Sequence, residues 1–275
     1  MKHALIGYSG FVGTTLLKQT SFDSLYRSTT IAKINGQSFD TVVCAAAPAQ
    51  KWIANREPEA DRATIDGLIE HLKSLTCQMF ILISTVDVYN NPIGVDEDTP
   101  VVESGLHAYG LHRRLLEKFV VDHFPNHLIV RLPGLVGPGL RKNVIFDFLN
   151  DNNLHTIDHR AVFQFYPMVN LWFDIQTALA AALKLVHLTA EPVNVAEVAE
   201  EGFGKRFGQI LANPPAVYDF RSLYGELFGG RGPYQYSKRE TIQAIRAYAQ
   251  SEPVTMMAKD ETMAKEAVMT KDRMR

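Results

Sequence analysis

The chain has 275 residues, enough for one large domain or for a large domain with a small appendage. Hydrophobic residues make up 46% and charged residues 21% of the sequence, a balance typical of soluble globular proteins. A net charge of -2 lacks the basic excess with which proteins bind nucleic acids or anionic membranes. We therefore expect no nucleic-acid partner and no membrane association.

The cysteines, the histidines and the N-terminal residues narrow the class of protein further. Cys44 and Cys77 fall in or just before apolar strand-like runs, which favours buried free thiols over a disulfide. The first apolar run starts almost at once, which leaves no room for a signal peptide, and no apolar run is long enough to span a membrane. The 9 histidines show no metal-ligand spacing. These features predict a cytoplasmic protein without a metal site.

The first predicted element is a short strand, 4–6, which stops at a glycine and is followed by a helix-like segment, 14–19. A strand, a glycine turn and a helix N-terminus together present free N–H groups and a positive helix end to a pyrophosphate. Gly7 permits the tight turn, Gly10 lets the backbone approach the phosphates, and Gly13 lets the helix pack closely on the strand. Simple turn punctuation is the alternative, but the position after the first strand favours a nucleotide site. The residues assigned to this cofactor turn are Gly7, Ser9, Gly10, Phe11, Val12 and Gly13.

The spacing G-x-x-G-F-V-G over residues 7–13 resembles the signature of the extended short-chain dehydrogenase/reductase superfamily, which includes nucleotide-sugar epimerases, dehydratases and reductases. The resemblance implies an α/β fold with a Rossmann-type doubly wound parallel sheet and a smaller C-terminal substrate-binding part. We expect a dinucleotide-binding core over 1–160 and a substrate-binding part over 161–253. One core helix of that part, 174–188, should return to the sheet. Residues 254–275 are expected to form a peripheral or disordered tail, and a homodimer is expected by analogy alone.

The second strand, predicted over 24–31, bears on the choice of cofactor. In the dinucleotide fold, an acidic residue at its end binds the 2′-hydroxyl of NAD, whereas an arginine accommodates the 2′-phosphate of NADP. The chain offers Arg27 and Ser28 there, while Asp23 precedes the strand and would lie at its wrong end. The sequence therefore favours NADP(H), with NAD(H) as the alternative. A solvated surface position is the other interpretation of Arg27.

Small residues follow the next predicted strand, 40–44. Ala45, Ala46 and Ala47 would let a cofactor lie across the strand end, and the superfamily has a similar alanine-rich stretch. The segment before this strand is short, which predicts a reduced third strand of the usual fold. Residues 128–139 resemble the superfamily's later strand and its glycine–proline segment, and we assign Pro133 to the cofactor from that resemblance.

Two further segments resemble the superfamily's catalytic motifs. A buried strand, 79–83, runs into Ser-Thr-Val-Asp-Val-Tyr, similar to S-[ST]-x-x-V-Y, and the catalytic hydroxyl falls on Thr85. A helix opening near residue 107 carries Tyr109 and Arg113 one turn apart, similar to Y-x-x-x-K, with Glu117 at the superfamily's glutamate. Arginine stands where the superfamily has lysine. A hydroxyl that only terminates its strand is the alternative for Thr85.

These residues imply carbonyl chemistry. Tyrosine has a pKa near 10, and a cation one turn away, together with the nicotinamide charge, should move that pKa towards neutrality. Tyr109 would then exchange a proton with the substrate oxygen, which Thr85 would align, while Arg113 would supply the cation. Asn143 is assigned to the substrate by resemblance, and Asp87 is assigned to it as well. Arg231, a loop residue between Gly230 and Gly232, is a further candidate that would reach a substrate phosphate, and a solvated position is at least equally consistent with it.

The resulting prediction is an NAD(P)-dependent oxidoreductase or epimerase that acts on a carbonyl or hydroxyl of a small substrate such as a nucleotide sugar. The alternative is a non-catalytic NADP(H)-binding sensor or scaffold. Arg113 favours the alternative, whereas Thr85, Tyr109 and Glu117 together favour the enzyme.

Overall fold

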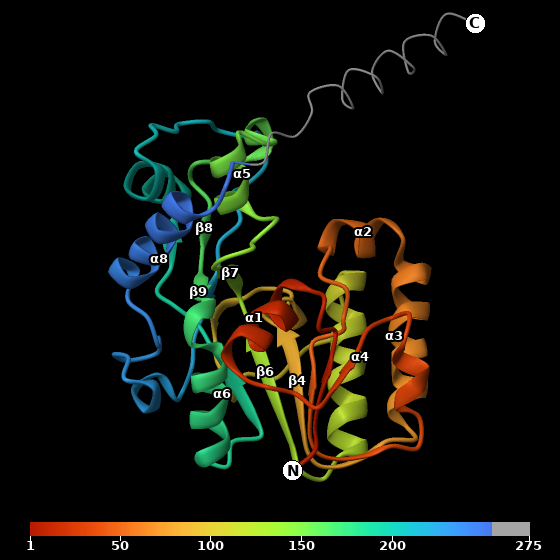
Figure 1. The fold of residues 1–275 in the computed structure, drawn as a ribbon. Coiled ribbons are helices and arrows are strands. Elements are labelled where there is room, and N and C mark those ends of the chain that lie inside the picture. The colour runs from red at the N-terminus through yellow and green to blue at the C-terminus, as the bar shows by residue number, and fades with distance from the viewer. Residues whose placement is uncertain (255–275) are drawn as a thin grey trace, which may run out of the picture.

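The chain folds around one parallel sheet. The computed structural model describes residues 1–254. In the central sheet every neighbouring pair of strands is parallel (Figure 1). Its strands, in spatial order, are β10 (Leu185–His187), β6 (His127–Leu132), β4 (Thr76–Thr85), β3 (Ser38–Cys44), β1 (His3–Ile6) and β2 (Ser24–Tyr26). The predicted α/β class with a Rossmann-type sheet is confirmed.

Helices cover both faces of this sheet, as a doubly wound fold requires (Figure 1). On one face lie α3 (Pro58–Leu72) and α4 (Ala108–His123), and on the other α1 (Phe11–Gln19) and α6 (Leu171–Ala180). Side chains alternate between the faces along each strand, so Ala4 and Ile6 pack into the first cluster and Leu5 into the second. Burial on both faces explains why the strands read as continuous apolar runs.

The edge of the sheet at β2 is shorter than the sequence predicted. The strand ends at Tyr26 rather than at residue 31, because Arg27 N donates to Thr30 Oγ1 at 3.1 Å and the chain turns there. A single 3-10 turn, η1 (Ile31–Ile34), then leads towards β3. β2 is the last strand on this side of the sheet within residues 1–254, so the predicted reduction of the third strand is confirmed.

The predicted helix over 174–188 is wrong in its second half. The helix α6 ends at Ala180, and the backbone reverses at Ala182, which has a φ of 54°. Residues Leu185–His187 form β10, which pairs with β6 and completes the sheet. The alanine- and leucine-rich composition fits a helix locally, but the sheet offers the segment an unpaired edge and a buried apolar face.

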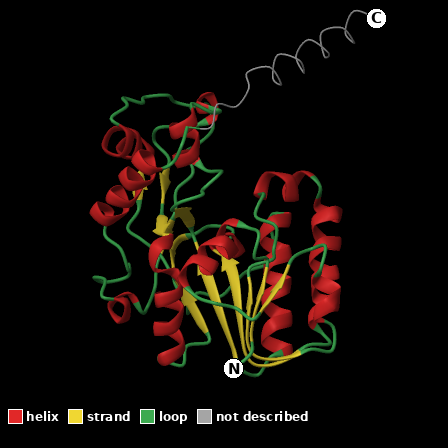
Figure 2. Cartoon of the chain, in the orientation of Figure 1, coloured by secondary structure: helices red, strands yellow, loops and turns green. Residues whose placement is uncertain are grey.

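The C-terminal residues build a second, smaller cluster of short elements beside the sheet (Figure 2). The remaining helices and strands are α2 (Lys51–Arg56), η2 (Val86–Val88), β5 (Ile93–Val95), β7 (Gly134–Val136), α5 (Val144–Asn150), η3 (Leu154–Thr156), β8 (Val162–Phe163), β9 (Phe165–Pro167), η4 (Met168–Asn170), β11 (Val193–Asn194), α7 (Val195–Glu197), η5 (Val198–Gly202), β12 (Asp219–Phe220), η6 (Gly225–Phe228) and α8 (Lys238–Ser251). The predicted tail, 254–275, lies outside the described residues except for residue 254. Within the described part, no helix combines the length and apolar character needed to cross a membrane.

Glu117 joins α4 to the sheet from a fully buried position. Its Oε1 accepts hydrogen bonds from Ser84 Oγ at 2.6 Å and Arg131 Nε at 2.9 Å, and its Oε2 accepts from Arg131 Nη2 at 2.7 Å. Burial acts to raise the pKa of Glu117, but the hydrogen bonds and charge of Arg131 hold it below its ordinary value. The glutamate matched to the superfamily therefore ties α4 to β4 and β6.

We predict that Glu117→Ala lowers the free energy of unfolding by about 3–5 kcal/mol, because it leaves the buried Arg131 without its counter-ion. Glu70→Ala, in the exposed pair with Lys73, should change it by about 1 kcal/mol or less. Urea unfolding measures both. The folded pKa of Glu117 is lowered, so its stabilisation is present above about pH 4.5 and is lost as the pH falls through the folded value. Equal losses in the two variants would contradict the assignment.

Candidate active site

The turn between β1 and α1 contains three glycines, and the packing of the fold requires two of them. Gly7 has a φ of +86°, and a Cβ there would lie 2.3 Å from Ala45 O. A Cβ on Gly13 would lie 2.2 Å from Gly7 O. A Cβ on Gly10 would meet Gly7 O at 3.5 Å, an ordinary contact, so packing among the described residues leaves its outer side open. Packing among the described residues therefore does not require glycine at position 10.

The groups around the turn suit a dinucleotide. Gly10 is the N-cap of α1, with no side-chain cap and no acidic residue in the first turn, so the helix end keeps free N–H donors and a positive end. The stretch Ala45–Ala47 flanks the turn, because Ala45 N donates to Ile6 O at 2.8 Å. Gly7 N donates a hydrogen bond to Tyr26 O at 2.8 Å, which joins the turn to the end of β2 as well.

The residues after β2 therefore lie next to the turn, where the adenosine ribose is expected. Arg27 is exposed, and its Nε donates to Thr29 Oγ1 at 3.0 Å. Among residues 1–254 no carboxylate pairs with it. Ser28 follows it in the same exposed turn. Asp23 instead accepts from His3 N at 2.7 Å, at the opposite end of the strands, as the sequence predicted.

Tyr109 and Thr85 meet at the carboxyl edge of the sheet. Thr85 ends β4, and Tyr109 lies in the first turn of α4, where it is 8% exposed. The first turn of α4 packs so closely on η2 that a Cβ on Gly110 would lie 2.0 Å from Asp87 O. Burial raises the pKa of Tyr109, against the charge of Arg113 and hydrogen bonding with Thr85, which lower it. In the protein without cofactor, desolvation outweighs the cation, and the shift predicted for the cation together with the nicotinamide charge stays a prediction.

Arg113 is committed to the neighbouring helix. Its Nη2 donates to Asp61 Oδ1 at 2.9 Å and also to Pro48 O, and its Nη1 donates to Asp61 Oδ2. The side chains of Arg113 and Asp61 are 3% and 5% exposed, and the guanidinium carbon lies 4.0 Å from the centre of the Tyr109 ring. His112 Nδ1 bonds the same carboxylate at 2.7 Å. The fork thus joins α4 to α3 and is not free to reach a bound ribose in this conformation.

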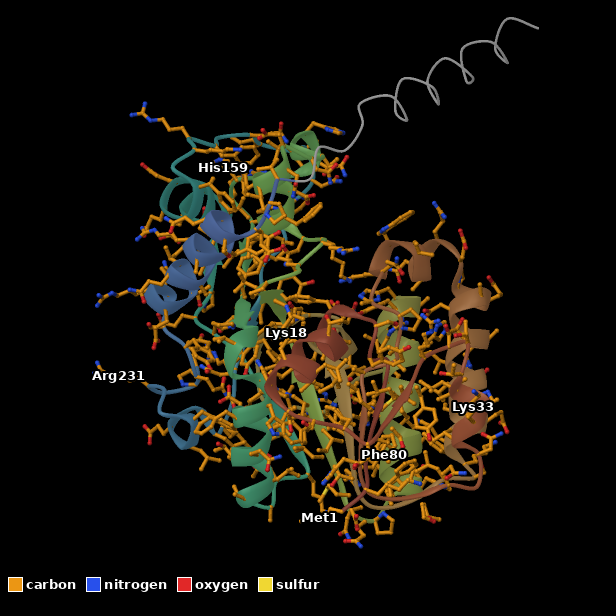
Figure 3. The ribbon with its side chains drawn as sticks, viewed as in Figure 1. Met1, Lys18, Lys33, Phe80, His159 and Arg231 are labelled. Carbon is orange, nitrogen blue, oxygen red and sulfur yellow. The ribbon has the colours of Figure 1, made fainter. Side chains whose placement is uncertain are left out.

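The three predicted substrate residues lie in different surroundings in the structure. Asp87 lies in η2, next to Thr85. The Asn143 side chain is used within the fold, since Oδ1 accepts from Ile145 N at 3.0 Å and Nδ2 donates to Leu135 O at 2.9 Å. Arg231 is exposed at the outer edge of the C-terminal part and points away from the sheet (Figure 3), so it does not join the site. Pro133 directly follows β6 at the same sheet edge as Thr85.

Sequence reasoning missed four polar side chains close to Tyr109 or to its neighbours Asp87 and Arg113. Lys51 Nζ lies 2.7 Å from Asp87 Oδ1, and Tyr218 OH lies 3.3 Å from the same oxygen. The missed residues are Lys51, His107, Lys142 and Tyr218. In the sequence, the one signal for any of these residues is the position of Lys51 shortly after the alanine stretch that follows β3. Within the described residues, no group of three or more histidine, cysteine or acidic side chains is placed to hold a metal.

Comparisons with known proteins define the fold. No family model matches the chain, and no curated protein matches it. Solved structures match over almost the whole chain. A dTDP-4-dehydrorhamnose reductase from Clostridium acetobutylicum is 17% identical with a TM-score of 0.67, covering 91% of this chain and 99% of the other. The Bacillus anthracis enzyme of the same name, in complex with NADP, is 15% identical with a TM-score of 0.65, covering 92% and 99%.

A UDP-galactose 4-epimerase is similar to the same degree, with 17% identity, a TM-score of 0.67 and coverage of 94% of this chain and 99% of the other. At these identities the likeness shows a shared fold. The chain shares its fold with these two dTDP-4-dehydrorhamnose reductases and with the UDP-galactose 4-epimerase, as the resemblance in the glycine spacing implied.

The turn geometry predicts opposite outcomes for two glycine variants. Gly10→Ala should fold with nearly unchanged stability but bind NADPH at least ten-fold more weakly, because the new methyl occupies the space of the pyrophosphate. Gly13→Ala should lower the melting temperature, because its Cβ meets backbone at 2.2 Å. Thermal unfolding and NADPH fluorescence titration separate the two. A Gly10→Ala protein that binds NADPH as tightly as wild type would remove the cofactor from this turn.

Proposed function

We propose that this chain, which has the fold of the extended short-chain dehydrogenases/reductases, is an NADP(H)-dependent reductase of a small carbonyl substrate. The observation that carries the proposal is the arrangement at the carboxyl edge of the sheet. Thr85 ends β4 there, Tyr109 lies in the first turn of α4, and packing leaves Gly10 of the glycine turn open. A proton donor, an aligning hydroxyl and a dinucleotide cradle are the parts that carbonyl reduction needs.

The residues around the turn would hold a dinucleotide. The turn from Gly7 to Gly13 would hold the pyrophosphate, and Ala45–Ala47 would lie beneath the cofactor. Arg27 and Ser28 would face the ribose, and the absence of a carboxylate partner for Arg27 in the described chain supports a 2′-phosphate. When bound, the cofactor supplies the hydride. We assign the cofactor to residues 1–160 and the substrate to 161–253, with β10 added to the sheet.

The Tyr109 hydroxyl would act as the proton donor of a carbonyl reduction. Burial raises the pKa of Tyr109, so the hydroxyl would keep its proton until a carbonyl oxygen beside it gains negative charge. Thr85 would donate a second hydrogen bond to the same oxygen and fix its position. Resemblance in fold to reductases and epimerases of nucleotide sugars supports a nucleotide sugar as the substrate class.

One observation favours a second candidate, a non-catalytic NADP(H)-binding sensor or scaffold. Arg113 cannot contact a bound ribose while Asp61 and Pro48 hold its guanidinium. The expected arrangement of the superfamily's cation is then missing, although the cradle for the cofactor is intact. The two candidates agree on cofactor binding and differ on turnover.

Tyr109→Phe tests the reductase directly. The change removes the proton donor and keeps the ring, so NADPH oxidation with a responsive carbonyl substrate should fall by about 10²- to 10⁴-fold. NADPH affinity should be almost unchanged. Absorbance of NADPH with a panel of nucleotide sugars and simple carbonyls gives the rates. An unchanged rate in Tyr109→Phe would make the tyrosine structural, and tight NADPH binding without turnover on the whole panel would favour the sensor.

Arg27→Ala tests the cofactor assignment. Wild type should bind NADPH more tightly than NADH, and the variant should lose about ten- to hundred-fold in NADPH affinity, the value of a charge-assisted hydrogen bond to phosphate. NADH affinity should stay nearly constant. Lys33→Ala, a basic residue in η1 beyond the turn, is the matched control. Tighter binding of NADH by wild type would refute the assignment.

A further inference from the structure

The two cations nearest Tyr109 are both paired with carboxylates. Arg113 is bound to Asp61, as described above. Lys51 Nζ is 2.7 Å from Asp87 Oδ1, with side chains 39% and 16% exposed, and 3.3 Å from Tyr218 OH. The second pair has no counterpart among the residues that the sequence assigned to catalysis.

The position of this second pair connects three parts of the site. Lys51 is the first residue of α2, which follows the alanine stretch at the cofactor turn. Asp87 lies in η2, and its backbone N–H donates to Thr85 Oγ1 at 3.2 Å. Tyr218 comes from the C-terminal part, just before β12. The first turn of α4, which carries Tyr109, packs on Asp87 O.

A carboxylate beside a phenol opposes its ionisation, since two like charges would share a desolvated site. Asp87 acts on Tyr109 in this direction, and Lys51 acts in the opposite direction. Two other titratable groups lie near this pair. Burial, followed by the charge of Lys51, lowers the pKa of His107, so its ring is neutral at neutral pH, whereas Lys142 keeps its charge and its Nζ donates to Ala49 O. The Lys51–Asp87 pair thus joins two opposite charges that act on Tyr109 in opposite directions.

We infer that Lys51 is a positioning residue of the site, which holds and neutralises Asp87 and thereby controls the ionisation of Tyr109. Its charge adds to that of Arg113, which also lowers the pKa of Tyr109 but is bound to Asp61. The inference rests on the proposed role of Tyr109 as proton donor. It assigns Asp87 to the charge balance of the site, beside any contact with substrate.

The test reads the ionisation of residue 109 itself. Difluorotyrosine, which is more acidic than tyrosine and nearly isosteric with it, is placed at position 109 of the full chain, and fluorine NMR follows its titration. Lys51→Met removes the ammonium, and Lys51→Arg keeps a positive charge. Lys238→Met is the matched control, because Lys238 is 44% exposed and paired with Glu197 at 2.9 Å in α8.

Lys51→Met should raise the pKa at position 109 by about one unit, the effect of losing an opposite charge nearby. Lys51→Arg and Lys238→Met should leave it at the wild-type value. Asp87→Asn should lower it, which tests the same coupling in a protein that retains Lys51. In the double variant Lys51→Met/Asp87→Asn, the pKa at position 109 should be close to the wild-type value and slightly below it. The inference is overturned if Lys51→Met leaves the pKa unchanged, or if the double variant shows the full upward shift of Lys51→Met.

The titration needs neither substrate nor turnover, so it is independent of the proposed reductase activity. If the variants show the expected pKa shifts at position 109 but the protein never oxidises NADPH, the role of Lys51 is supported and only the reductase proposal is contradicted. If turnover is found, the alkaline limb of the rate profile should move with the titration in the same set of variants. Activity that depends on Tyr109 but keeps its pH profile in Lys51→Met would contradict the role of Lys51 and leave the reductase standing.

Discussion

The parallel pairing of the six strands is the constraint on which the candidate site depends. Because β1, β3, β4 and β6 run in one direction, their carboxyl ends meet at the same edge. The glycine turn, the alanine stretch, Thr85 and Pro133 all follow those strand ends. The connecting helices α1 and α4 begin at the same edge, which brings the free N–H groups of α1 and the ring of Tyr109 to one place. Polar groups gather there because the strand interiors are apolar on both faces.

Buried ion pairs fix the orientation of α4 against this sheet. Glu117 binds Arg131 on the sheet side, and Arg113 binds Asp61 on the α3 side, each with both partners almost fully buried. Breaking such a pair by removing one partner costs about 3–5 kcal/mol, so a bound cofactor would need a comparable gain to draw Arg113 away from Asp61. The helix that carries Tyr109 is thus held from two sides, and Arg113 contributes to this attachment. The charges of Arg113, Asp87 and Lys51 all act on Tyr109 itself.

The local parts of this structure could be predicted from the sequence, and the long-range parts could not. Gly7 and Gly13 are dictated by contacts within or next to the turn, so their spacing reveals the turn. Tyr109 and Thr85 are recognisable because each occupies a fixed place in a short motif. The ion pair of Arg113 joins residues 52 positions apart, and no local pattern indicates that Asp61 faces it. The strand β10 was missed because an edge of the sheet, absent from local sequence, decides between helix and strand for residues 185–187.

The most direct test of the account is a crystal structure of the protein with NADPH bound. The account predicts the pyrophosphate on the backbone at Gly10, the 2′-phosphate at Arg27 and Ser28, and the nicotinamide within reach of Tyr109 and Thr85. It also predicts that Arg113 remains on Asp61 and that Lys51 remains on Asp87. A cofactor bound elsewhere would contradict the site. An Arg113 guanidinium that leaves Asp61 for the nicotinamide ribose would contradict the structural role of the Arg113–Asp61 pair.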